Sequence, residues 1–130
     1  MRFPYARLVM PSLGADDPQA FAKGRRWLAA GVGGFMVMHG TRPDSRRLVD
    51  ALNREARWPL LFSIDAEYGI ANRLRPATPI PPIAAIGVAD DAGLAYAAGR
   101  ATALECLEAG VGWVFGPVMD VQSNPKNPII

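Results

Sequence analysis

Residues 59–75 read PLLFSIDAEYGIANRLR, an apolar run that ends abruptly in two carboxylates, Asp65 and Glu67. The run over residues 60–64 has the length of a buried strand, and Pro59 stops the helical pattern before it. Parallel α/β folds present their chemistry at the carboxyl ends of their strands. This stretch therefore predicts a strand that carries two acidic side chains to the functional edge of a parallel sheet.

Three further apolar runs predict strands at residues 6–10, 34–38 and 112–115. The first three strands in the chain begin roughly 26 to 28 residues apart, which is the spacing of successive βα units. The sequence Ala-Gly-Val-Gly precedes both the second strand, at residues 30–33, and the fourth, at residues 109–112. A glycine just past a helix end permits a left-handed cap, so this echo predicts a repeated unit.

Helical patterns fill the spaces between these strands. Each starts at a residue that caps helices well. The first starts at Asp17, which is followed by Pro18, the second at Thr41, and the third at Asp90 or Asp91. We expect the helices to end at Gly31, before Pro59 and at Gly110. The third helix should have one apolar face, formed by Leu94, Ala97, Ala98, Ala101 and Leu104. Residues 65–89 contain four prolines and show no periodicity, which predicts a long functional loop.

Four βα repeats with right-handed crossovers fit either a doubly wound open sheet or part of a barrel. A barrel of eight units needs roughly 250 residues, and this chain has 130. In the barrel alternative, the chain therefore supplies about half of the structure.

Composition excludes several classes of protein. Half of the residues are apolar, 20% are charged and the mean hydropathy is +0.08, as in a folded globular domain. The net charge is only +2 and the basic residues are dispersed, so we expect no nucleic-acid partner. The single cysteine, Cys106, excludes a disulfide framework and a cysteine metal site. Residues 1–12 lack the apolar core of a signal peptide, and no run approaches the ~18 residues of a membrane span, so we expect no membrane contact and a cytoplasmic location.

Four side chains with acid, base or binding chemistry follow predicted strands. Asp65 and Glu67 are two residues apart, so in an extended segment they point the same way. They form either an acid and base pair, or one ligand-binding carboxylate beside a structural one. His39 follows the second strand, where a structural or rim role and a catalytic role remain open, and Asp120 follows the fourth, where structural and ligand-shaping roles remain open. The sequence holds no second metal ligand beside His39 and no phosphate loop, so we expect no metal and no cofactor.

Two long segments resemble one family. Residues 59–74 resemble the glycoside hydrolase family 3 signature in which a strand ends in Asp-x-Glu-Gly-Gly-Arg-Val-x-Arg-Leu, most closely in the β-N-acetylhexosaminidase branch. Residues 110–130, GVGWVFGPVMDVQSNPKNPII, resemble the later segment Gly-Ile-Asn-x-x-x-Ala-Pro-Val-x-Asp-Val-x-x-Asn-Pro-x-Asn-Pro-x-Ile. Residues 31–38 fit the strand that precedes the signature. The resemblance implies the first four βα units of a TIM-like (β/α)8 barrel, with residues 1–130 as half of one domain.

The resemblance also implies roles for single residues. The family uses a retaining mechanism with a covalent glycosyl-enzyme intermediate. Asp65 matches the aspartate that binds sugar hydroxyls, Asp120 matches one that we assign to shaping the pocket, and Arg73 matches a structural arginine of the signature. His39 joins the candidate substrate-binding residues, and Glu67 is assigned to supporting the loop.

Two kinds of departure accompany this resemblance. Tyr68 replaces the first glycine after the glutamate and Ile70 replaces the first arginine, which predicts a reshaped loop and an altered sugar specificity. The family's sugar-binding arginine, its Lys-His pair and its catalytic aspartate match no residue of this sequence. We therefore expect no catalytic residue among these 130 and no activity of the isolated chain.

The resemblance predicts a glycoside hydrolase that acts on β-linked sugars, of the β-N-acetylhexosaminidase or β-glucosidase type. Its substrate is expected to be a carbohydrate. One alternative is a non-catalytic carbohydrate-binding module or a half barrel completed by self-association or by the remainder of the barrel. Another is an aldolase-like barrel acting on phosphorylated substrates. That alternative needs a lysine at a strand end, and Lys23 and Lys126 are poorly placed for it.

Overall fold

A computed structural model describes residues 5–124, 126 and 127. Its main sheet is formed by β1 (Ser12–Gly14), β2 (Gly34–Met38), β4 (Leu61–Asp65) and β6 (Trp113–Phe115), and all neighbouring strands are parallel. The helices are η1 (Ala6–Leu8), α1 (Ala20–Ala30), α2 (Arg42–Glu55), α3 (Ile83–Ala89) and α4 (Ala92–Glu108). Two short strands, β3 (Gly40–Thr41) and β5 (Leu74–Arg75), pair with each other outside the main sheet.

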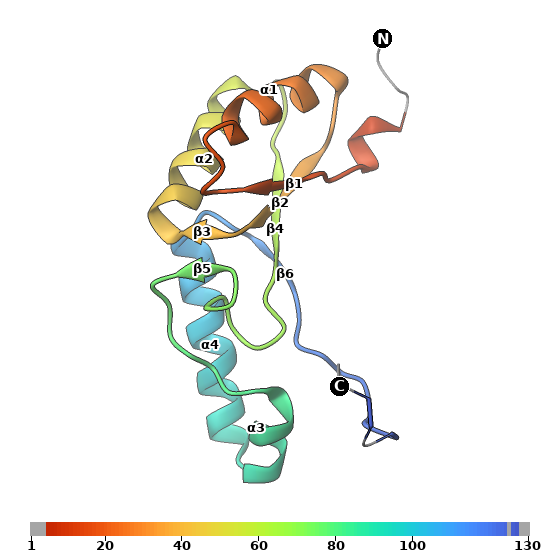
Figure 1. The fold of residues 1–130 in the computed structure, drawn as a ribbon, viewed down its shortest axis with the longest axis vertical. Helices are drawn as coiled ribbons and strands as arrows, with labels where there is room; N and C mark the ends of the chain where they lie inside the picture. Colours follow the sequence, from red (N-terminus) through yellow and green to blue (C-terminus); the bar gives the residue numbers. More distant parts are fainter. Residues whose placement is uncertain (1–4, 125, 128–130) are drawn as a thin grey trace.

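The order of strands in the sheet is β1-β2-β4-β6, the same as their order in the chain. A doubly wound sheet reverses its strand order at a switch point, and this sheet does not. Right-handed crossovers that always step in the same direction place all the connecting helices on one face. Figure 1 shows α1, α2 and α4 along the same side of the strands. The architecture is therefore that of the first four βα units of a barrel.

The face of the sheet that meets the helices is buried in β1, β2 and β4 and partly buried in β6. Leu13 pairs with Val37 and Ile64 pairs with Val114, so these side chains lie in one row across the four strands. Val37 and Ile64 have no exposed surface, and Leu52 of α2 is equally buried against them in the core. The alternation of side chains along each strand therefore sends one set of apolar residues into the core beneath the helices.

The opposite face carries the alternate residues and is more exposed, although Ser63 in β4 is fully buried. Met36 pairs with Ser63, Ser63 with Trp113, and Asp65 with Phe115, so these residues share that face. The rings of Trp113 and Phe115 lie 5.0 Å apart and are 42% and 39% exposed. In a closed barrel this face is the interior.

The repeated glycine turns predicted from the sequence are confirmed. Gly31 has φ 99° and Gly110 has φ 84°, which are left-handed conformations that favour glycine. After each glycine, a valine N–H donates a hydrogen bond back to the preceding helix, from Val32 to the Trp27 carbonyl and from Val111 to the Cys106 carbonyl. The same cap thus turns the chain back into the sheet twice.

The first strand was predicted at residues 6–10, and this prediction is wrong. Residues 6–8 form the short helix η1, in which Leu8 is 82% exposed. The strand follows Pro11, which has no N–H to donate but accepts a 3.1 Å hydrogen bond from the Met36 N–H. Only Leu13 of β1 is buried. Because its neighbours in the strand are the polar Ser12 and Gly14, the sequence has no apolar run that would predict this strand.

Two helix predictions and one loop prediction need adjustment. The helix expected to start at Asp17 begins at Ala20, because a turn that is closed by the Asp17 carbonyl and carboxylate precedes it. The residues predicted to form one face of α4 include Leu94 and Leu104, and both are exposed. Residues 65–89 are not irregular throughout, since they contain β5 and α3. Thr41 and Asp91 do cap α2 and α4, by accepting hydrogen bonds from N–H groups of the first turns.

Candidate functional site

Asp65 is the last residue of β4 and lies on the open face of the sheet, at its carboxyl edge. The strand reaches this position because Phe62, Ser63 and Ile64 are all buried before it. Beyond β4, the Ala66 N–H donates to the Phe115 carbonyl over 3.1 Å, so the chain stays on the sheet for one further residue. The carboxylate of Asp65 is therefore held by a rigid strand rather than by a loop.

Arg73 donates a hydrogen bond from Nη2 to Oδ2 of Asp65, which joins two residues that the sequence analysis treated separately. The exposed fractions of the two side chains are 24% and 29%. Arg73 belongs to the turn before β5, and its backbone N–H donates to the Ile70 carbonyl. The predicted sugar-binding carboxylate and the predicted structural arginine thus form one ion pair at the carboxyl edge.

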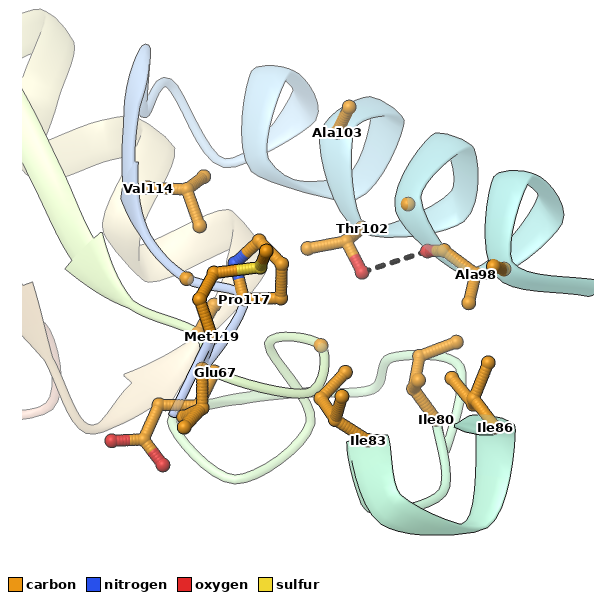
Figure 2. A pocket seen from close by; sticks show the side chains of 16 residues that line it. Glu67, Ile80, Ile83, Ile86, Ala98, Thr102, Ala103, Val114, Pro117 and Met119 are labelled. Atoms are coloured by element: carbon orange, nitrogen blue, oxygen red, sulfur yellow. Dashed lines mark hydrogen bonds between the residues drawn. The ribbon is translucent and has the colours of Figure 1, made fainter. Parts of the chain in front are cut away.

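Glu67 lies two residues beyond Asp65 and is half-buried. Figure 2 shows its carboxylate turned away from the isoleucines of the neighbouring cavity. Gly69 has φ 90°, and a Cβ there would come within 2.7 Å of the Ile80 side chain. The second glycine of the Glu-Gly-Gly signature is thus required by this loop, whereas the first is replaced by Tyr68, which is partly exposed.

His39 directly follows β2, the strand beside β4, and its side chain is exposed at the carboxyl edge. Its carbonyl accepts hydrogen bonds from the N–H groups of Ala15 and Asp16, over 2.7 and 3.2 Å. Its backbone therefore ties the loop after β1 to the end of β2, and its imidazole is at the same edge as Asp65.

Asp120 lies in the segment that follows β6, and it is exposed. Figure 1 shows this segment running away from the sheet beyond β6. The structure therefore pairs Asp65 with Arg73, and it shows Asp120 as an exposed residue of the segment after β6.

A cavity of about 350 Å³ lies between α3, α4 and the start of the segment after β6. Figure 2 shows the three isoleucines of this cavity, Ile80, Ile83 and Ile86, facing α4. On the α4 side, the hydroxyl of Thr102 is used within the helix, where it donates to the Ala98 carbonyl over 2.9 Å. The lining is almost entirely apolar, so this cavity lacks the polar groups that sugar recognition requires.

This cavity was not predicted from the sequence, because residues 65–89 were interpreted as an irregular loop. The available signal was the i, i+3 spacing of Ile83 and Ile86 after Pro82.

The contact that holds this loop in place was not predicted either. Glu105 of α4 accepts hydrogen bonds from the N–H and hydroxyl of Thr78, over 2.8 and 2.9 Å.

Across residues 5–124, 126 and 127, no three histidine, cysteine, aspartate or glutamate side chains gather as ligands of a metal ion would. None of the helices in the same part of the chain is long and apolar enough to cross a bilayer. What the edge does offer is a carboxylate held by a guanidinium, with a histidine beside the neighbouring strand end. Such groups suit the binding of a polar, hydroxylated ligand.

Comparison with known proteins gives one consistent family. The family model described as the glycosyl hydrolase family 3 N terminal domain matches residues 17–130. A beta-N-acetylglucosaminidase/beta-glucosidase from Cellulomonas fimi is 31% identical over 98 residues, which cover 75% of this chain and 17% of that protein. A beta-hexosaminidase from Methylococcus capsulatus is 34% identical over 123 residues, which cover 89% of this chain and 35% of that protein.

A solved structure agrees with these matches. The glycoside hydrolase family 3 beta-N-acetylglucosaminidase from Paenibacillus sp. str. FPU-7 superposes with a TM-score of 0.80 and 30% identity, over 95% of this chain and 25% of that one. The chain thus spans about a third or less of the length of each of these relatives.

Proposed function

Because the chain belongs to the family of glycosyl hydrolase family 3 N-terminal domains, we propose that it supplies the first half of the barrel of a β-glycosidase. Residues 1–130 form the first four βα units of one domain and contribute part of its sugar-binding face. The substrate class is a β-linked N-acetylglucosaminide, since the relatives named beta-N-acetylglucosaminidase and beta-hexosaminidase are similar over most of this chain. A β-glucoside is the second substrate class, because one relative carries both activities in its name.

The position of Asp65 is the observation that carries this proposal. Its carboxylate lies at the carboxyl end of β4, on the face of the sheet that becomes the barrel interior. In barrel enzymes substrates bind at that end. A carboxylate oxygen accepts hydrogen bonds from sugar hydroxyls, and a charged acceptor makes these bonds stronger than a neutral one would.

Asp65 and Glu67 do not suit the two catalytic roles of a retaining glycosidase. Those roles need two carboxyl groups that flank the scissile bond, about 5 to 5.5 Å apart. Here both carboxylates follow the same strand, and Asp65 is already paired with Arg73. We assign Asp65 to binding, with His39 and Asp120 as further residues of the binding face, and we expect the isolated chain to be inactive.

The test measures hydrolysis of aryl β-N-acetylglucosaminides and aryl β-glucosides by the intact protein that contains this chain. Asp65→Ala should lower kcat/KM about 100-fold, because charge-assisted hydrogen bonds to the sugar are lost. Asp50→Ala is the matched control, since Asp50 pairs with Arg46 on the surface of α2 over 3.0 Å. Asp65→Ala with unchanged activity would contradict the binding assignment. Turnover by the isolated 130 residues would contradict their expected inactivity.

A second candidate function rests on the open face of the sheet. Trp113 and Phe115 are about 40% exposed there, and the edges of β1 and β6 are unpaired within the described residues. Exposed apolar surface and open strand edges favour association. A non-catalytic half barrel would bind carbohydrate or assemble with a copy of itself. Light scattering separates the candidates, because a chain that stays monomeric at high concentration argues against self-assembly.

A further inference from the structure

We propose that Glu105 of α4 is a positioning residue for the carboxyl edge of the sheet, because its carboxylate clamps the short β3–β5 pair. One half of this clamp is two hydrogen bonds from Thr78, which follows β5. The other half is an ion pair with Arg42, which follows β3. The effect on sugar binding rests on the proposed function, whereas the clamp itself does not.

The β3–β5 pair needs support from outside. β3 and β5 have two residues each and pair with each other apart from the main sheet. Of these four residues, only Leu74 is buried. A two-stranded pair has little stability of its own in water. The β3–β5 pair therefore depends on contacts that the flanking residues make.

The Glu105 side chain is only 14% exposed. Its Oε1 accepts hydrogen bonds from the N–H and the hydroxyl of Thr78, over 2.8 and 2.9 Å. Its Oε2 is buried and has no hydrogen-bond partner among the described residues. Burial of a carboxylate is costly unless donors compensate for the lost water. Because one of the two donors is a backbone N–H, these bonds fix the path of the chain just after β5.

Arg42 brings the other strand of the pair to the same carboxylate. Its Nη1 lies 3.8 Å from Oε1 of Glu105 and 2.7 Å from Oε2 of Glu108. Glu108 is 68% exposed, and an ion pair that is open to water contributes little. Water screens the attraction to the less exposed Glu105 less strongly. Since Thr41 ends β3 and caps α2, a force on Arg42 acts on the end of β3.

The clamped pair is continuous with the proposed binding face. β3 directly follows His39, and β5 ends the loop that starts after Asp65. Both segments thus reach the carboxyl edge next to strands that Glu105 holds. We therefore expect a loosened clamp to move His39 and the loop after Asp65 together.

The first measurement is hydrogen exchange in the intact protein that contains this chain, on peptides that cover residues 70–80. In Glu105→Ala these amides should exchange about 10- to 100-fold faster, which is the effect of losing a hydrogen bond to a charged group. Glu108→Ala is the matched control, since it removes a carboxylate from the same helix and the same arginine but leaves Thr78 bonded. The control should leave this exchange unchanged, and neither variant should alter exchange in β2 and β4.

The second measurement is kcat and KM on an aryl β-N-acetylglucosaminide. Glu105→Ala should raise KM about 10-fold with a smaller change in kcat, because displaced binding groups hold the sugar less well. Glu105→Gln should recover much of the affinity, since its amide oxygen can still accept from Thr78. Glu108→Ala should leave both constants unchanged.

Unchanged exchange in Glu105→Ala, or equally fast exchange in Glu108→Ala, would overturn the clamp. Faster exchange with an unchanged KM would overturn the positioning role. If Glu105→Ala does not fold, Thr78→Val decides by the same two measurements, because Thr78 is exposed and the change removes only the hydroxyl donor. Absence of turnover in the unmodified protein would contradict the proposed function and the positioning role with it, and the exchange result would still decide the clamp.

Discussion

Burial raises the pKa of the Cys106 thiol to about 11, and the neighbouring Glu105 carboxylate adds to the effect. The side chain is only 2% exposed. At pH 8 roughly one thiol in a thousand is therefore ionised, and the thiolate is the reactive form.

We predict that native Cys106 does not react with a thiol reagent at pH 8 on the minute scale. Unfolding in urea should restore the reaction, because it removes the burial that raises the pKa. The absorbance of a released aromatic thiolate follows the reaction, and Cys106→Ala sets the background. Rapid modification of the folded chain would show that Cys106 of α4 is not buried in the core.

The pKa of Asp17 is lowered, first by its hydrogen bond with the Lys23 ammonium and next by the bond from the Gln19 N–H. A carboxyl whose pKa is lower in the folded state stabilises the fold above its unfolded pKa, which is about 3.9. That stabilisation is lost as the pH falls through the lower, folded value.

We therefore predict that Asp17→Asn lowers the unfolding midpoint at pH 7, and that the difference from the unmodified chain shrinks below about pH 4. Thermal unfolding over pH 2.5–7 measures it. Asp90→Asn, at an exposed position after α3, is the comparison. A difference that stays constant with pH would exclude the charge of Asp17 as its cause.

At the site itself, sequence reasoning was informative about single residues but not about their partners. Asp65 was predictable because a continuous apolar run that stops at two acidic residues indicates a buried strand ending in a carboxylate. Its bond to Arg73 was not predictable. It depends on the path of residues 66–75, which β5 and the buried Ile70 determine.

Among the elements, the pairing of β2 with β4 imposes a strict packing requirement on one residue. Gly34 is opposite Leu61, and a Cβ on Gly34 would lie 2.0 Å from the Leu61 carbonyl oxygen. Backbone atoms cannot move aside as the end of a side chain can. Only glycine fits at this crossing of the two strands.

We predict that Gly34→Ala destabilises the fold by about 1–3 kcal/mol, as overpacking of a core does. Gly99→Ala in α4 is the matched control, because a Cβ there meets nothing within 4 Å. The control should stabilise the helix by up to ~1 kcal/mol. Urea unfolding midpoints compare the two, and equal midpoints would contradict the predicted clash.

The errors in predicting elements have a common physical cause. Residues 6–10 are mostly apolar, but the edge strand of the four-stranded sheet is β1, which is short and contributes a single buried side chain. The β3–β5 pair and α3 are similarly short and depend on tertiary contacts. The long elements, α2 and α4, were predictable because their caps, Thr41 and Asp91, are local.

At the scale of the whole molecule, the described chain has one face covered by helices and one face open. On the open face, Trp113 and Phe115 form an aromatic pair. We predict that replacing both with glutamine reduces concentration-dependent association of the isolated chain by about tenfold in affinity, since apolar burial drives such contacts.

Sedimentation velocity measures this association. Tyr96→Gln is the control, because Tyr96 is 73% exposed on α4, away from the aromatic pair. Association that persists in the double variant, or that Tyr96→Gln abolishes, would place the contact on the helical side.

The strand order β1-β2-β4-β6 also bears on how the chain folds during synthesis. Each strand of the main sheet pairs with the strand of that sheet made just before it, so no pairing has to wait for a later strand. A ribosome that releases residues from the N-terminus onward presents each new strand to an edge that already exists. The fold can therefore grow in the direction of translation, one unit at a time.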